Sequence, residues 1–148
     1  VRPRRAQSPA GGTRVRYGGV AVFTTPPTGE TLAGEADVVF RIDRDVSPMT
    51  DTFGPVGDLD GDGFDDVVYS GFSNSEAYVF YGPIERTGNI LHTDADATIR
   101  GANFTKIRGA DLNGDGVHDL VLADRSYNDN SGAAWVFLGG TTTDTGGL

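Results

Sequence analysis

The dipeptide Val-Phe recurs at an interval of 57 residues, and this repetition constrains the fold more than any other feature of the sequence. It occurs as Val22-Phe23, Val79-Phe80 and Val136-Phe137, each time at the end of a short apolar run. A second series, in which an Asp-rich segment leads into another apolar run, occupies residues 58–69 and returns 53 residues later at 111–122. Repeats of this size that hold several strands each are typical of β-propeller blades.

The apolar residues lie in short runs of β-branched and aromatic types, separated by clusters of Gly, Asp, Asn, Pro and Ser. This alternation predicts an all-β protein, because such runs favour strands and such clusters favour turns. We therefore expect β-propeller blades of antiparallel four-stranded sheets, about two and a half repeats in all, which do not close into a ring alone. The expected strands are residues 20–23, 38–42, 67–69, 78–81, 120–122 and 135–138.

The two series divide the chain into four segments. They are a basic N-terminal tail at 1–13, the end of a first repeat at 14–30, a complete repeat at 31–87 with an Asp-rich loop at 58–66, and a second complete repeat at 88–148 with its loop at 111–119. A closed propeller usually has four to eight blades. The chain is therefore expected to be part of a longer protein or a subunit whose copies join.

The Asp-rich loops carry the strongest chemical signal, the pattern D-x-[DN]-x-[DN]-G-x-x-D. Side-chain oxygens at positions one, three, five and nine, with a main-chain carbonyl at position seven, form an oxygen cage that suits Ca²⁺. The sixth residue, Gly63 or Gly116, is expected to have a positive φ where the chain turns. The candidate ligands are Asp58, Asp60, Asp62, the carbonyl of Phe64 and Asp66 in the first loop, and Asp111, Asn113, Asp115, the carbonyl of Val117 and Asp119 in the second.

Two other interpretations of these loops agree less well with the sequence. An EF-hand needs a Glu at position twelve and flanking helices, whereas position twelve is Tyr69 or Leu122, both of a core type. A plain hairpin turn would explain one such loop, but not two that stand in the same place before an apolar strand. At position eight, Asp65 and His118 are expected to face the solvent rather than the cation.

The two segments that contain these loops resemble FG-GAP repeats of the integrin α-subunit type. The resemblance covers most of residues 49–140, from the Asp-rich loops to the Val-Phe strands. It implies propeller blades with a cation held in the hairpin between the first two strands of each blade, on the ligands named above. The sequence departs from the family where Ser70-Gly71-Phe72 and Ala123-Asp124-Arg125 replace Gly-Ala-Pro, and where Phe104 is followed by Thr105.

Composition limits the possible functions. The chain has 148 residues, no cysteine, two histidines and a net charge of −9 at pH 7. The missing cysteine excludes thiolate metal sites and Cys nucleophiles, and the acidic charge argues against nucleic acid or an anionic membrane as a partner. No apolar run reaches the roughly 20 residues of a membrane-spanning helix. Because no nucleophile elbow or phosphate loop is present either, we expect no enzymatic activity.

The sequence thus predicts a calcium-binding, extracellular structural or adhesion module that holds two Ca²⁺ ions. Its expected partners are other protein subunits, either copies of itself or the remainder of a longer chain. Two alternatives stay open from the residues alone, namely a non-catalytic propeller segment of a larger secreted enzyme and a carbohydrate-binding propeller.

Overall fold

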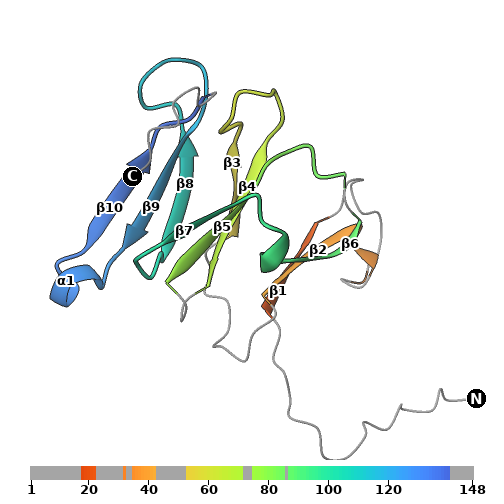
Figure 1. The fold of residues 1–148 in the computed structure, drawn as a ribbon, viewed down its shortest axis with the longest axis horizontal. Coiled ribbons are helices and arrows are strands. Elements are labelled where there is room, and N and C mark those ends of the chain that lie inside the picture. Colours follow the sequence, from red (N-terminus) through yellow and green to blue (C-terminus); the bar gives the residue numbers. More distant parts are fainter. Residues whose placement is uncertain are drawn as a thin grey trace, which may run out of the picture.

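Three β-sheets stand side by side in the computed structural model, which describes residues 18–22, 32, 35–42, 53–71, 75–85 and 87–140 (Figure 1). The expected tail at 1–13 lies outside the described residues. The strands are β1 (Gly18–Val22), β2 (Val38–Ile42), β3 (Phe53–Gly57), β4 (Asp66–Gly71), β5 (Glu76–Phe80), β6 (Gly88–Leu91), β7 (Ala97–Arg100), β8 (Lys106–Ala110), β9 (Asp119–Asp124) and β10 (Ala133–Phe137). Two short turns, η2 (His92–Asp94) and α1 (Tyr127–Asn130), complete the described elements.

The all-β expectation is confirmed, and the sheets formed by the described strands do not close on themselves. The central sheet has the order β3-β4-β5-β7 and is antiparallel throughout, as expected for a four-stranded blade. On one side of it lies the sheet β10-β9-β8, and on the other the sheet β1-β2-β6 (Figure 1). Each of these outer sheets has three described strands, and the pairing of β2 with β6 is parallel.

Strand pairing crosses the boundary that the sequence suggested at residues 87 and 88. β7, from the expected second repeat, pairs with β5, and β6 pairs with β2 of the first sheet. The four-stranded unit therefore extends from Phe53 to Arg100. The sequence pattern could not fix this boundary, because a repeating pattern does not show where one structural unit begins.

A third repeated pattern supports this grouping of the strands. Ala36-Asp37 leads into β2, which ends near Arg41, and Ala95-Asp96 leads into β7, which ends at Arg100. β2 pairs antiparallel with β1 just as β7 pairs antiparallel with β5. β1 and β2 thus correspond to β5 and β7 of the central sheet.

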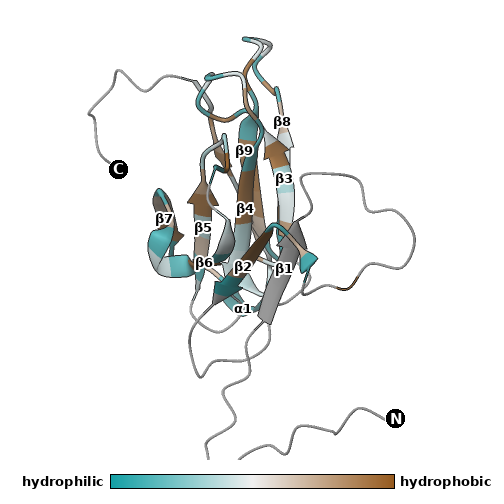
Figure 2. Cartoon of the chain, turned by 90° about the vertical axis from the view of Figure 1, so that its right-hand side faces the viewer, coloured by the Kyte–Doolittle hydropathy of each residue, from teal (hydrophilic) through white to brown (hydrophobic). Residues whose placement is uncertain are grey.

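The central sheet is buried on both faces. Successive side chains of a strand point to opposite sides, and in β5 the side chains on both sides are buried. Figure 2 shows its strands β4 and β5 coloured mostly as hydrophobic. Toward β2 and β6, its aromatic residues pack against Phe40, whose ring centroid lies 5.0 Å from that of Phe80. Toward the sheet β10-β9-β8, Val68 and Val79 pack in a second cluster with Leu122.

The central sheet and the sheet β10-β9-β8 come closest at their first strands, β3 and β8. Gly109 of β8 lies so near the main chain of Val56 that an added Cβ would be 1.6 Å from the Val56 carbonyl oxygen. Only glycine fits at this crossing.

Candidate metal centre

Both Asp-rich loops lie at the same end of the molecule, one between β3 and β4 and the other between β8 and β9 (Figure 1). Each therefore joins the first two strands of its sheet. Most of their residues are exposed, and Phe64 projects with 52% of its surface accessible. The local sequence explains why the chain curls here, since Asp and Gly favour tight turns over strand pairing.

In the first loop, the carboxylate of Asp58 organises the main chain. Its Oδ1 accepts hydrogen bonds from the N–H groups of Gly61 (2.7 Å) and Asp62 (3.2 Å), and its Oδ2 accepts one from Gly63 (2.8 Å). Gly63 has a φ of 93°, which confirms the expected turn, and Gly61 at position four has a φ of 82° that the sequence interpretation missed. The loop is thus wound around its first residue.

The second loop repeats this geometry. Asp111 accepts from Gly114 (2.6 Å), Asp115 (3.2 Å) and Gly116 (3.0 Å), in the same order of donors. The φ values of Gly114 and Gly116, 81° and 91°, match those of the first loop. Two segments 53 residues apart in the chain therefore have the same local fold.

The ninth residue of each loop is fully buried and joins three parts of its sheet. Asp66 accepts from Leu59 N–H (2.7 Å) inside the loop and from Gly82 N–H (2.7 Å) just after β5. Asp119 accepts in the same way from the N–H groups of Leu112 (2.8 Å) and Gly139 (2.9 Å). Sequence reasoning treated both only as ligands, because their second partner lies about 16 to 20 residues downstream.

Three carboxylates of the first loop converge. Asp58, Asp60 and Asp66 each offer an oxygen, and these oxygens lie within 4.8 Å of one another. Asp62 lies outside this group, and its carboxylate accepts the N–H of Phe64 (2.9 Å). A hard cation that prefers oxygen, such as Ca²⁺, fits this donor set.

Electrostatics within the first loop favour a cation. Burial raises the pKa of Asp66 above its usual value despite its two N–H donors, and the nearby Asp60 and Asp58 charges add to this. For Asp58, desolvation is outweighed by the N–H groups of Gly63, Gly61 and Asp62, so its pKa is lowered. A bound cation would offset the mutual repulsion of these carboxylates.

The second loop carries less negative charge, because Asn113 replaces the third-position Asp. The Asn113 Nδ2 donates to Asp115 Oδ2 (2.8 Å). The N–H of Val117 lowers the pKa of Asp115, and the bond from Asn113 adds to this effect. We expect an ion bound here to be held less tightly than in the first loop.

His118, expected to face the solvent, instead contacts the first loop. Its main-chain N–H donates to the carbonyl oxygen of Asp58 (2.8 Å). Its ring lies against Gly57, where an added Cβ would be 2.5 Å from the His118 Cγ. Position 57 favours glycine for two reasons, namely its φ of 78° and the lack of space for a Cβ beside His118. The two loops are therefore in direct contact, a fact that repeat spacing alone could not reveal. Asp65 is exposed as expected.

The geometry of the two loops agrees with a comparison against protein families. Residues 58–122 match the FG-GAP-like repeat family. The matched segment begins at the first residue of the first loop and ends in β9, so it includes both loops. The FG-GAP-like repeat found here thus contains every candidate ligand. No curated protein and no solved structure matched the chain significantly.

Two aromatic side chains at equivalent places in β5 and β10 take structural positions. Tyr78 is buried in the cluster with Phe40, and Trp135 is half-buried between the rings of Phe104 and Tyr127, at centroid distances of 5.6 and 5.0 Å. Among the described residues, no helix has the length and apolar character needed to cross a membrane.

Proposed function

We propose that this chain is a calcium-binding structural module that holds one Ca²⁺ ion in each Asp-rich loop. The observation that carries the proposal is the pair of loops with the same hydrogen-bonded geometry, both inside the segment that matches FG-GAP-like repeats. The first ion would be bound by Asp58, Asp60, Asp62, the Phe64 carbonyl and Asp66, and the second by Asp111, Asn113, Asp115, the Val117 carbonyl and Asp119.

The proposed role of the ion is structural. Asp66 and Asp119 each connect a loop to the segment after the third strand of the same sheet. An ion on these carboxylates would therefore stabilise the sheet as well as the loop. It would supply charge neutralisation, while the chain's own N–H groups keep the carboxylates oriented. We propose no catalytic role for it.

Exposed loops of this kind suit a place where calcium is abundant. Extracellular calcium modules work with dissociation constants of roughly 0.1–1 mM, well above cytosolic calcium levels. This supports an extracellular location and a role in protein contact, as in adhesion or in assembly with further subunits. Two bound ions would also reduce the net charge from −9 to −5.

Calorimetric titration of the metal-free full chain with CaCl₂ tests the proposal. We expect two ions per chain and a higher melting temperature in calcium than in EDTA. Asp60→Ala should remove the tighter binding event and leave one ion per chain. Asp65→Ala, in the same loop but exposed at position eight, is the matched control and should bind two ions. A melting temperature that is the same in calcium and EDTA, with no heat of binding, contradicts the proposal.

A further inference from the structure

A main-chain hydrogen bond joins the second Asp-rich loop to the first. The N–H of His118 donates to the carbonyl oxygen of Asp58 (2.8 Å). The N–H of one residue and the carbonyl of the residue before it belong to the same planar peptide group. The group that donates this bond is therefore the one whose carbonyl, on Val117, is the proposed position-seven ligand of the second loop.

The peptide group that accepts this bond leads to a proposed ligand of the first loop. The Asp58 carbonyl shares its peptide group with the N–H of Leu59, and this N–H donates to Asp66 Oδ2 (2.7 Å). Two peptide groups and two hydrogen bonds thus connect the Val117 carbonyl with the Asp66 carboxylate. Leu59 is buried, and Asp58 and His118 are half-buried, so the connection is partly shielded from water.

A second connection between the loops runs through the segment after β10. The N–H of Gly139 donates to Asp119 Oδ1 (2.9 Å), and the N–H of Gly140 donates to the carbonyl oxygen of Leu59 (2.8 Å). Asp119 is the buried ninth residue of the second loop, so this path also starts at a proposed ligand. Both connections meet at Leu59 of the first loop.

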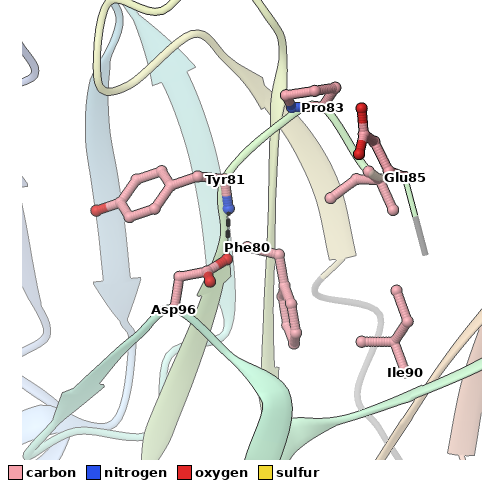
Figure 3. Close-up of a pocket in the computed structure, with 7 residues that line it drawn as sticks. Phe80, Tyr81, Pro83, Glu85, Ile90 and Asp96 are labelled. Carbon is pink, nitrogen blue, oxygen red and sulfur yellow. Dashed lines mark hydrogen bonds between the residues drawn. The ribbon is translucent and has the colours of Figure 1, made fainter.

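The equivalent segment after β5 bonds within its own sheet. The N–H of Tyr81 donates to the carboxylate of Asp96 (3.0 Å), which directly precedes β7 and is shown with a dashed line in Figure 3. The N–H of Gly82 donates to Asp66. The reach of Gly140 to the loop of another sheet is therefore a feature of the junction between the two loops.

We propose that the two calcium sites are coupled, so that an ion in either loop raises the affinity of the other loop for calcium. The coupling rests on the proposed function, because it concerns the same two ions. With its oxygen on a cation, the Val117–His118 peptide group is more strongly polarised, and its N–H becomes a better donor to Asp58. The contact also orders both loops together, so the second ion meets a loop that is already partly ordered.

Repulsion between the two ions acts in the opposite direction. Salt screens such repulsion between exposed charges over about 8 Å at 0.15 M ionic strength. The main-chain connections are direct and half-buried, so salt weakens them less. We therefore expect positive coupling at the low end of the usual range, about fivefold. Each loop must raise the affinity of the other by the same factor.

Calorimetric calcium titrations of the full chain and of two single-loop variants measure the coupling at 0.15 M ionic strength. Asp60→Ala disables the first loop, and Asp115→Ala disables the second. The product of the two association constants of the parent should exceed the product of the two single-loop constants about fivefold. Asp65→Ala removes one charge from the first loop but no ligand, so it controls for charge and should change the parent's product less than about twofold.

Two variants at position 118 locate the first connection. His118→Ala and His118→Pro both remove the imidazole, but only proline removes the main-chain N–H. The coupling factor should be kept in His118→Ala and at least halved in His118→Pro. Equal coupling in the two variants overturns the proposed connection.

A second pair of variants gives the same test if His118→Pro does not fold. A Cβ added at Gly139 would clash with the carbonyl oxygens of His118 and Leu59, one from each loop, so Gly139→Ala pushes the loops apart. At Gly82, the nearest atoms to an added Cβ belong to the first loop alone. Gly139→Ala should lose the coupling, and Gly82→Ala should keep it. Coupling kept in both overturns the proposal.

Hydrogen exchange measures the shared ordering directly. In Asp115→Ala only the first loop binds calcium, yet the His118 amide of the second loop should exchange more slowly once calcium is added. The double variant Asp60→Ala/Asp115→Ala is the control and should show no such change. Equally fast exchange with and without calcium in Asp115→Ala overturns the proposal.

The titrations also separate the coupling from the proposed function. No heat of binding to either loop overturns both. Two bound ions, with a parent product equal to or smaller than the product of the single-loop constants, overturn the coupling alone and leave the calcium-binding module in place.

Discussion

The central sheet and the sheet β10-β9-β8 are built from the same repeat, yet only the central one is enclosed. Every residue of β5 is buried, whereas in β10 half-buried and exposed residues alternate. The Asp-rich loops of the two sheets nevertheless have the same turns and the same hydrogen bonds. Loop geometry thus follows from the local sequence, and burial follows from the neighbouring sheet.

The largest difference between the two sheets should appear when the same charge is placed on both. Val79→Asp buries a carboxylate without a partner and should cost more than about 3 kcal/mol of the free energy of unfolding, enough to unfold a marginal domain. Val136→Asp, at the equivalent exposed position, should cost less than about 1 kcal/mol. Urea denaturation of both variants measures this. Similar losses would mean that β10 is covered in solution.

The two buried Asp residues should contribute equally to the free energy of unfolding, and they should do so even in the absence of calcium. Asp66→Ala or Asp119→Ala leaves two main-chain N–H groups without their acceptor, at a cost of about 2–3 kcal/mol each. Asp62→Ala, which removes an exposed proposed ligand, should cost under about 1 kcal/mol in EDTA. Thermal and urea unfolding in EDTA distinguish the two roles. Equal, small effects of all three would assign Asp66 and Asp119 to ligand binding alone.

Exchanging the third loop residue should remove the expected difference in calcium affinity. Asp60→Asn should weaken binding in the first loop about tenfold, and Asn113→Asp should strengthen it in the second by a similar factor, since affinity follows the number of charged ligands. That factor corresponds to about 1.4 kcal/mol. Calcium titration of each single variant, with the other loop unchanged, gives the dissociation constants. No change on either exchange would contradict the assignment of position three as a ligand.

A smaller, pH-dependent difference should come from Asp124, whose place in the central sheet is taken by Gly71. Desolvation acts to raise its pKa, but the N–H and Oγ–H of Ser126 (2.8 and 2.7 Å) and the N–H of Asn103 (3.0 Å) outweigh it, so the pKa is lowered. Because the folded-state pKa lies below the unfolded value of about 3.9, this stabilisation is present above that pH and is lost as the pH falls through the folded value.

The measurement compares the free energy of unfolding of the parent and of Asp124→Asn across pH 2–7 in EDTA. The parent should be more stable by about 1–2 kcal/mol above pH 5. The two proteins should converge toward pH 2. A constant difference across this range would show that the pKa of Asp124 is not lowered by folding.

The sequence predicted residue ranges for the strands that carry apolar runs, and it gave none for the strands that do not. β4, β5, β9 and β10 lie close to the expected ranges. β3, with Gly54 and Pro55, and β8, with two cationic residues, have few apolar side chains, and their pairing depends on the neighbouring strands. β7 is equally weak by composition, and only the recurrence of Ala-Asp and Arg around β2 and β7 could have revealed it.

The loops were the most predictable part of the candidate site, since position and residue type define them. Their turn glycines have the expected backbone conformation. The contacts of Asp66 with Gly82 and of His118 with Asp58 were not predictable, because each joins segments whose separation in space depends on the assembled sheets.

The contact between Gly109 and Val56 determines how consecutive sheets are angled. With no side chain between them, β3 and β8 meet main chain to main chain, while Ile99, Trp135 and Phe137 hold the later strands of the same two sheets apart. The space between the sheets is therefore a wedge that narrows toward β3 and β8. A row of repeats packed in this way would curve around an axis on that side, and a side chain at Gly109 would work against this curvature.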